Sequence, residues 1–260
     1  MTESVKITRY DKNKISNKED LVVLEHKVNI YVNGEHYISL MCLPMDLEEL
    51  AVGFLYSEGL ISSYAEIVSI DSSETDNVLI VTHPTSLRSQ TVTHGEHEVR
   101  TIVSGFTRGS VSPSLFNHDN LPVITSKAKI KSGEIIDMAA HFSKQSELFQ
   151  KTGAVHSCML ISDGKELFYE DIGRHNAVDK IIGKTLIACS PPYNGILLTS
   201  GRISSEMLIK TAKANIPILI STSAPTNMAV QIACEMNMTL IGFTRGNRFN
   251  IYSGVHRVIP

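Results

Sequence analysis

Hydrophobic residues in the second half of the chain form short unbroken runs that polar segments separate. Residues 195–199 (GILLT), 216–220 (IPILI) and 239–243 (TLIGF) are such runs, and each has the length of a buried β-strand. Helical patterns follow the first two runs, and a last strand is predicted at residues 249–252. Because strands without polar alternation are buried on both sides, this region predicts an α/β sheet covered by helices on both faces.

Three polar loops follow these predicted strands. In chain order they are Ser200-Gly201-Arg202, Ser221-Thr222-Ser223 and Thr244-Arg245-Gly246-Asn247-Arg248. In parallel βα units the loops after the strands meet at one sheet edge, where helix starts present free N–H groups to anions. We therefore expect a phosphate-bearing ligand held by Arg202, Arg245 and Arg248, since guanidinium groups match phosphate in a bidentate way. The alternative is that these polar residues are ordinary exposed loops.

The segment EDIGRHNAVDK at residues 170–180 concentrates polar chemistry where an extended segment turns into a helix. One interpretation is a helix start capped by Asp171 or Asn176, with solvated charges. For His175 two roles remain open, a hydrogen-bonded structural residue or a cofactor contact that moves a proton, because imidazole titrates near neutrality. Ser204 or Ser205 is expected to cap the helix after residue 202.

The first half of the chain predicts a smaller α+β part. Asn33-Gly34 indicates a type I′ hairpin between strands at 28–32 and 37–41, and Leu47–Glu58 predicts a helix that Gly59 ends. Residues 1–20 are polar and expected to be poorly ordered at the very tip, whereas residues 134–149 predict one helix. We expect two domains, residues 1–125 with the hairpin and a glycine-rich loop, and residues 126–260 with the ligand site.

Composition narrows the class of protein. The 260 residues are 42% hydrophobic and 20% charged, as in ordinary globular proteins. A formal net charge of −3 argues against a general nucleic-acid binder. No apolar run approaches the roughly 18 residues that span a bilayer, and the start lacks an apolar signal core, so we expect a cytoplasmic protein without membrane contact.

The four cysteines argue against zinc chemistry. Cys42, Cys158, Cys189 and Cys234 form no CxxC pair. We consider a zinc-dependent deaminase as an enzyme alternative. Such an enzyme needs a CxxC pair together with an HxE motif, and His156 does not begin an HxE motif. Each thiol lies in or beside an apolar pattern, which favours buried, inert cysteines.

Several motifs together resemble those of a known family. They are LPMDLEELAVGFLYSEGLI at 43–61, TGAVHS at 152–157, YEDIGRHNAVDKIIG at 169–183, LLTSGRISSEM at 197–207, STSAPTNMAV at 221–230 and LIGFTRGNRFNIYS at 240–253. In this order they resemble the FdhD/NarQ family of formate dehydrogenase accessory proteins. The resemblance spans most of the chain.

The resemblance implies a sulfur carrier that acts as a homodimer. A cysteine desulfurase would supply sulfur, which passes to the molybdenum (or tungsten) bis-molybdopterin guanine dinucleotide cofactor before insertion into the formate dehydrogenase catalytic subunit. The implied C-terminal fold is cytidine-deaminase-like. A free guanine nucleotide would mimic the cofactor, and the implied cofactor site comprises Phe243, Thr244, Arg245, Gly246, Asn247 and Arg248, which we combine with Arg202.

One position departs from the family pattern. The family's sulfur-bearing cysteine lies in a glycine-rich loop, whereas the matching segment here, residues 104–109, has Phe106 in that place. Phenylalanine cannot carry a persulfide, because sulfur exchange needs a thiolate. The alternatives are a cofactor-binding chaperone or guanine-nucleotide regulator without sulfur transfer, use of another thiol such as Cys158, a shifted alignment of the loop, or an altered residue.

Overall fold

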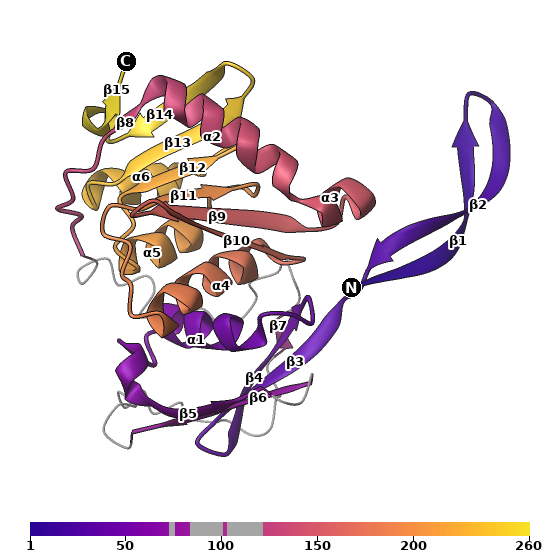
Figure 1. Ribbon diagram of the computed structural model, residues 1–260, viewed down its shortest axis with the longest axis horizontal. Helices are drawn as coiled ribbons and strands as arrows, with labels where there is room; N and C mark the ends of the chain where they lie inside the picture. Colours follow the sequence, from indigo (N-terminus) through magenta and orange to yellow (C-terminus); the bar gives the residue numbers. More distant parts are fainter. Residues whose placement is uncertain (73–75, 84–100, 103–121) are drawn as a thin grey trace.

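The larger of the protein's sheets is mixed. The computed structural model describes residues 1–72, 76–83, 101–102 and 122–260. Within them, six strands lie in the order β10-β9-β11-β12-β13-β14 (Figure 1). Their bounds are β9 His156–Ser162, β10 Lys165–Asp171, β11 Ile196–Thr199, β12 Ile218–Ser221, β13 Thr239–Arg245 and β14 Arg248–Ser253. β11, β12 and β13 are parallel, and the other neighbours pair antiparallel.

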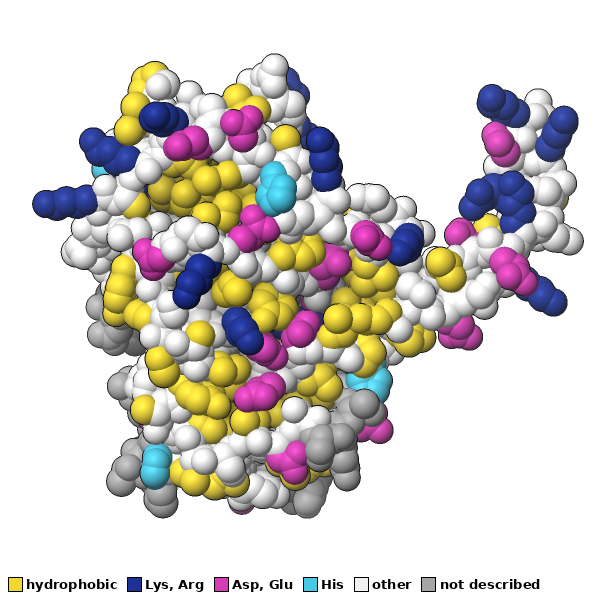
Figure 2. Space-filling model, viewed as in Figure 1, with side chains coloured by type: hydrophobic (Ala, Val, Ile, Leu, Met, Phe, Trp, Pro, Cys, Tyr) yellow, Lys and Arg dark blue, Asp and Glu magenta, His cyan; other side chains and the backbone are white. Residues whose placement is uncertain are grey.

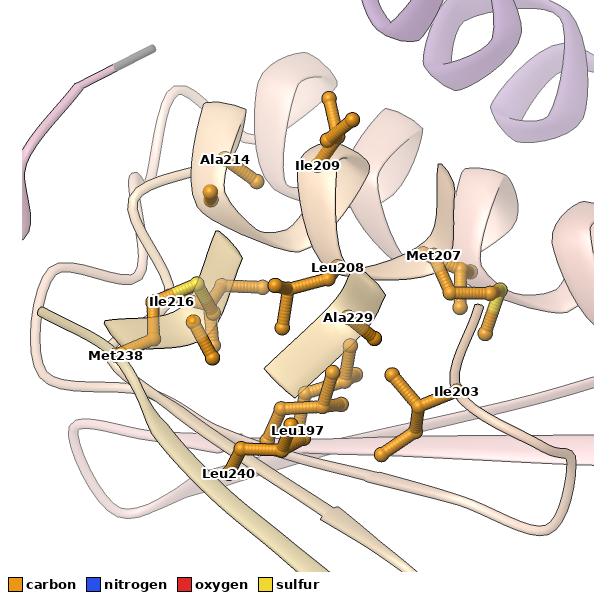
Figure 3. Close-up of a cluster of buried hydrophobic side chains, with 14 of the residues drawn as sticks. Leu197, Ile203, Met207, Leu208, Ile209, Ala214, Ile216, Ala229, Met238 and Leu240 are labelled. Carbon is orange, nitrogen blue, oxygen red and sulfur yellow. The ribbon is translucent and has the colours of Figure 1, made fainter. Parts of the chain in front are cut away.

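Helices cover both faces of this sheet, as the apolar runs predicted. On one face lie α4 Arg174–Ile187, α5 Ser205–Lys213 and α6 Asn227–Glu235, and Figure 3 shows Leu197 and Leu240 of the sheet beneath side chains of α5 such as Leu208. On the other face, α2 Ser132–Gln145 packs Ile135 and Phe142 against the sheet residue Leu198 and its neighbours. Successive strand residues point to opposite faces, so Leu197 and Leu198 enter different cores.

A second sheet forms around α1 Leu47–Glu58. Among the described residues its strand order is β5-β6-β3-β4-β7. The bounds are β3 His26–Val32, β4 Glu35–Cys42, β5 Ile67–Asp71, β6 Asn77–Thr82 and β7 Thr101–Ile102, with a 3-10 turn at Tyr64–Glu66. The predicted hairpin turn is confirmed by φ values of 53° at Asn33 and 85° at Gly34, and Gly59 ends α1 with φ 79°.

The two sheets are joined through α1 and α4, which pack against each other (Figure 1). Ser57 of α1 donates a 2.7 Å hydrogen bond to the Asp179 carboxylate of α4, and Lys210 of α5 forms an ion pair with the same carboxylate at 2.5 Å. Burial is the largest influence on Asp179 and raises its pKa, while Lys210 and Ser57 oppose that shift. These contacts lock the smaller sheet onto the larger one.

The sequence patterns predicted no strands in residues 1–20, and the structure corrects this. Residues Thr2–Asp11 (β1) and Lys14–Val23 (β2) pair along their full length as an antiparallel hairpin. Lys12 and Asn13 form its turn with φ values of 45° and 64°. The hairpin, which we call the arm, stands away from the body (Figure 1). Both faces of the hairpin are largely exposed, so its sequence lacks the alternation of apolar and polar residues that predicts a strand.

The single helix predicted at 134–149 is two helices. α2 ends at Gln145, and α3 spans Glu147–Thr152. Ser146 between them adopts ψ 94° and accepts a 2.9 Å hydrogen bond from Phe149 N, so it starts a new helix.

The segment that precedes α2 is tied to the larger sheet. Ile124 is buried, and its N–H donates to the carbonyl of Met236 at 2.9 Å. Ile130–Lys131 (β8) pairs with Val258–Ile259 (β15), which follows a 3-10 turn at Val255–Arg257. The domain boundary near residue 125 stays a prediction. No described helix is long and apolar enough to cross a membrane.

Candidate functional site

The polar loops after the strands lie in one row, as the parallel topology predicted. Ser200 N donates to Ser157 O at 3.0 Å, Thr222 N to Thr199 O at 3.2 Å, and Phe243 N to Ser223 O at 3.0 Å. These bonds join successive strand ends side by side. We call this row the strand-end edge; it comprises His156, Ser157, Arg174, His175, residues 199–204, residues 221–226 and residues 243–248.

Hydroxyl groups of the strand-end edge hold the loops to one another. Ser221 Oγ donates to the carbonyl of Gly201 at 2.7 Å, and Thr222 Oγ1 donates to the carbonyl of Ser200 at 3.4 Å. Thr244 differs, because its hydroxyl oxygen is buried without a hydrogen-bond partner among the described residues. The serines therefore shape the edge, whereas Thr244 keeps hydrogen-bonding capacity there.

Three helices start at this edge. Ser204 caps α5 by accepting from Met207 N at 3.4 Å, and Thr226 caps α6 by accepting from Ala229 N at 3.3 Å. Gly173 is the N-cap of α4 and has no side chain to close the first turn. The expected caps Asp171 and Asn176 were wrong for α4. Its uncapped start leaves positive dipole density for an anion.

Asp171 and Asn176 instead bind the smaller sheet. The fully buried Asp171 carboxylate accepts from Leu43 N at 3.1 Å and pairs with Lys180 at 2.8 Å. Asn176 donates to the carbonyl of Met41 at 2.9 Å and to Asp171 at 2.8 Å. The motif at 170–180 therefore fixes the start of α4 in place while leaving Arg174 and His175 at the edge.

Arg174 belongs to the edge although our list of predicted ligand residues omitted it. Its side chain crosses Gly201 so closely that a β-carbon there would lie 3.1 Å from Arg174 Cβ. Burial, followed by the charge of Arg202, lowers the pKa of Arg174. Its Nε is buried without a hydrogen-bond partner among the described residues. The sequence did indicate a role for Arg174, because residues 170–176 contain an unusual number of charged and polar side chains.

Two of the predicted arginines face each other across a hairpin. Arg245 at the end of β13 and Arg248 at the start of β14 are directly paired, with Gly246 at φ 56° in the turn between them. Arg245 Nε donates to the carbonyl of Thr222 at 3.0 Å, which ties the hairpin to the neighbouring loop. Like charges in opposed positions destabilise a strand pair, and an anion beside the two exposed guanidinium groups would offset that repulsion.

Phe243, the first residue of the predicted cofactor loop, has an unusual backbone. Its φ is 53°, a left-handed conformation that non-glycine residues rarely adopt, and its side chain is 43% exposed. The strained backbone turns an aromatic ring outward beside the arginine pair. An exposed ring there offers a stacking surface for a planar base.

Both histidines of the edge have a lowered pKa, which favours the neutral ring. Burial lowers the pKa of His175 well below its usual value, and the nearby charges of Lys210 and Arg174 lower it further. Its Nε2 lies 3.6 Å from the Glu206 carboxylate, too far for a hydrogen bond, and a neutral ring forms no ion pair. Burial and Arg174 likewise lower the pKa of His156, whose Nδ1 lies 3.4 Å from Ser200 Oγ.

The thiols are poorly placed for sulfur chemistry at this edge. Cys158 and Cys42 are fully buried, and burial raises the pKa of each to about 12. Cys189 and Cys234 are exposed, but they lie at the far ends of α4 and α6, about 20 Å and about 10 Å along helices that begin at the edge. Phe106, the position matched to the family's cysteine, lies outside the described residues.

A metal centre finds no support in the described residues. They contain no group of three or more His, Cys, Asp or Glu side chains placed to hold a metal ion. The edge is instead rich in guanidinium groups, hydroxyls and helix starts, which suit an organic anion.

Comparison with known proteins agrees with the motifs. The sequence profile of the FdhD/NarQ family matches residues 23–259. The chain belongs to the FdhD/NarQ family. The sulfur carrier protein FdhD of Wolinella succinogenes is 34% identical over 249 residues, which cover 95% of this chain and 86% of that protein. The sulfur carrier protein FdhD of Staphylococcus aureus (strain MRSA252) is 36% identical over 257 residues, covering 97% and 95%.

A solved structure supports the same assignment. The crystal structure of a proposed formate dehydrogenase accessory protein from Desulfotalea psychrophila superposes with a TM-score of 0.81 at 25% identity and covers 99% of both chains. The described residues therefore share their fold with that accessory protein.

Proposed function

We propose that this chain is a formate dehydrogenase accessory protein that binds a molybdenum or tungsten bis-molybdopterin guanine dinucleotide at the strand-end edge. The observation that carries the proposal is the opposed pair Arg245 and Arg248, held beside the loop of Thr222. Family membership and the names of the relatives support the same role. The partners proposed with it are a formate dehydrogenase catalytic subunit, a cysteine desulfurase and a second copy of the chain.

The residues of the edge fit the chemistry of this cargo. A guanine dinucleotide carries a pyrophosphate, which suits opposed guanidinium groups and the uncapped start of α4. Arg174 supplies a further donor, since its buried Nε has no partner among the described residues. The exposed ring of Phe243 is placed for stacking on a planar base. We therefore propose each residue from Phe243 to Arg248 as a contact of the cofactor, together with Arg202. Arg174 is a further proposed contact, which the structure adds to the residues predicted from the sequence.

Sulfur transfer is the part of the family role that this chain's residues support least. Within the described part of the chain no exposed thiol lies at the strand-end edge, and Cys158 is too buried to form a thiolate there. We propose that the chain binds and hands on the cofactor and that sulfur delivery needs a cysteine at Phe106. We also propose the cytidine-deaminase-like arrangement for the larger sheet and a cytoplasmic location.

The test is complementation in cells that lack their own FdhD protein, with formate dehydrogenase activity as the readout. The unchanged chain and a Phe106→Cys variant are expressed in parallel, each with and without Arg245→Ala. We expect Phe106→Cys to restore activity and Arg245→Ala to remove it. Failure of both the unchanged chain and Phe106→Cys contradicts the accessory role. Full activity of the unchanged chain contradicts the need for a cysteine at that position.

A further inference from the structure

The arm presents apolar side chains without a covering partner among the described residues. Tyr10 and Ile15 are direct cross-strand partners next to the turn, and they are 68% and 73% exposed. Met1 O accepts from Leu24 N at 2.8 Å and closes the base of the arm, and β2 contacts α3 of the body. A two-stranded hairpin is only marginally stable in water by itself. Its outer end therefore gains stability from any surface that covers Tyr10 and Ile15.

The outer end of the arm is also basic. Lys12 lies in the turn and Lys14 directly after it, against a single carboxylate, Asp11, and all three are exposed. Arg9 adds a third cation, although Asp20 lies 3.5 Å away and partly balances it. Figure 2 shows dark-blue side chains gathered at this end of the arm. A matching surface needs an apolar floor and acidic borders.

A groove at the base of the arm has that character. Its volume is about 420 Å³, and its apolar lining includes Met45, Leu148 and Phe168. Asp46, Glu147 and Glu170 border it, and Lys151, which also lines it, pairs with Glu147 at 3.0 Å. Figure 2 shows hydrophobic and acidic side chains side by side where the arm leaves the body.

Carboxylates contribute to the pKa shift of Tyr169, a residue that lines the groove. The pKa of Tyr169 is raised to about 12 by burial and then by the carboxylates of Glu49 and Asp46. Burial also raises the pKa of Asp46, while the charge of Lys180 opposes this shift and Glu49 adds to it. Cationic side chains that enter the groove would lie beside Asp46, Glu147 and Glu170.

An arm cannot place its outer end in the groove of its own chain. Met1 and Thr2, at the base of the arm, line that groove. The turn lies at the other end of ten-residue strands, about 33 Å away at the usual rise per residue. The ribbon would have to break its ladder to fold back. The occupant must therefore come from another molecule, and a second copy brings an arm and a groove at the same spacing.

We propose that the outer end of the arm docks in the groove of a second copy, with Tyr10 and Ile15 against the apolar floor and Lys12 and Lys14 beside the acidic border. The exchange is reciprocal, so two arms run past each other in a symmetric, isologous interface. The proposal assigns the surface of the proposed homodimer and does not depend on the ligand of the strand-end edge.

The test uses two single substitutions at exposed positions. Ile15→Asp removes the apolar contact of the arm, and Met45→Lys, at a side chain 39% exposed, puts a cation in the apolar floor of the groove. Val255→Asp is the control, because Val255 is 66% exposed at the carboxyl-terminal end of the chain. Sedimentation equilibrium should give twice the chain mass of 28.6 kDa for the unchanged protein and for Val255→Asp. Ile15→Asp and Met45→Lys should each sediment as single chains.

Mixing the two variants distinguishes a second copy from any other occupant. An Ile15→Asp chain keeps its groove, and a Met45→Lys chain keeps its arm, so the mixture forms one native contact and one contact between the new Asp and Lys. We expect mixed dimers where each variant alone is monomeric. A monomeric unchanged protein, a dimer that survives both substitutions, or a mixture that stays monomeric would each overturn the proposal. Guanine nucleotide binding, measured separately, keeps this outcome distinct from that of the proposed function.

Discussion

Gly53 of α1 and Gly183 of α4 face each other where the two helices cross. A β-carbon on Gly53 would lie 1.8 Å from the carbonyl oxygen of Asp179, and one on Gly183 would lie 1.9 Å from that of Glu49. Both helices continue through these glycines without positive φ values, so close approach rather than backbone freedom requires glycine here. The two sheets of the molecule meet at backbone-to-backbone distance.

Replacing either glycine with alanine should therefore destabilise the protein. We expect Gly53→Ala and Gly183→Ala each to lower the free energy of unfolding by about 3 kcal/mol, as strong overpacking does, despite the better helix propensity of alanine. Urea denaturation measures this. Gly133→Ala is the matched control, since a β-carbon there meets nothing within 4 Å. Equal stability of the two junction variants and this control would contradict the close crossing.

Loss of Arg248 should weaken ligand binding without weakening the fold. We expect Arg248→Ala to reduce guanine nucleotide affinity by about 1.5–3 kcal/mol, the range for hydrogen bonds to charged groups. The opposed Arg245 then loses a like-charged neighbour, so unfolding without ligand should be unchanged or harder by up to about 1 kcal/mol. Calorimetric titration and thermal unfolding measure the two effects.

Arg245→Ala tests the second member of the pair. It should cost similar affinity, but it also removes the hydrogen bond to Thr222 O and therefore gains no stability. Lys127→Ala is the control, because Lys127 is an exposed cation away from the strand-end edge. Its neighbour Ser126 donates a hydrogen bond to Asn194, which precedes β11, whereas the edge lies after the end of that strand. Unchanged binding in both arginine variants would exclude this hairpin from the ligand site.

The four thiols should differ sharply in reactivity. A thiol-alkylating reagent at mildly alkaline pH should modify Cys189 and Cys234 in the folded protein and leave Cys42 and Cys158 intact, since burial raises the pKa of both to about 12. Intact-mass spectrometry counts the adducts, and denaturation should expose all four sites. Rapid labelling of Cys158 in the folded state would restore it as a candidate sulfur carrier.

Stability should fall as the solution is acidified through the histidine range. The folded-state pKa of His175 lies well below the usual value of 6.5, so below that pH the unfolded chain binds a proton that the folded chain does not. The free energy of unfolding therefore decreases as pH falls, by up to about 1.4 kcal/mol per pH unit for this group. His175→Gln should flatten the slope, while His256→Gln at an exposed position should not. An unchanged slope in His175→Gln would place a protonated ring in the folded state.

The local patterns predicted most helices and strands of the larger sheet because each apolar run is buried as a unit. Leu47–Glu58 is helical with the predicted bounds, and the loops at 200–202, 221–223 and 244–248 share one edge as the parallel topology requires. The predicted site residues thus lie on the same edge, although their contacts with a ligand stay proposals.

Features that depend on distant partners could not be predicted from local patterns. The arm is a hairpin of polar strands whose amphipathic signal is absent, because little of it is buried in one chain. The break at Ser146 arises where its hydroxyl starts α3 and also contacts Glu170, a residue 24 positions away. Asp171 is a residue type that often caps helices, but its carboxylate accepts a hydrogen bond from Leu43 N, directly after β4 of the smaller sheet.

The hydrogen bonds from Asp171 and Asn176 to the backbone near residue 42 can form only late in synthesis. The paired positions are 128 and 135 residues apart, so the ribosome needs roughly 6–27 seconds between making one partner and the other. During that interval the nascent chain holds the amide of Leu43 and the carbonyl of Met41 without their final partners. The amino-terminal sheet therefore lacks these two hydrogen bonds until the motif at residues 170–180, about two thirds of the way along the chain, has been synthesised.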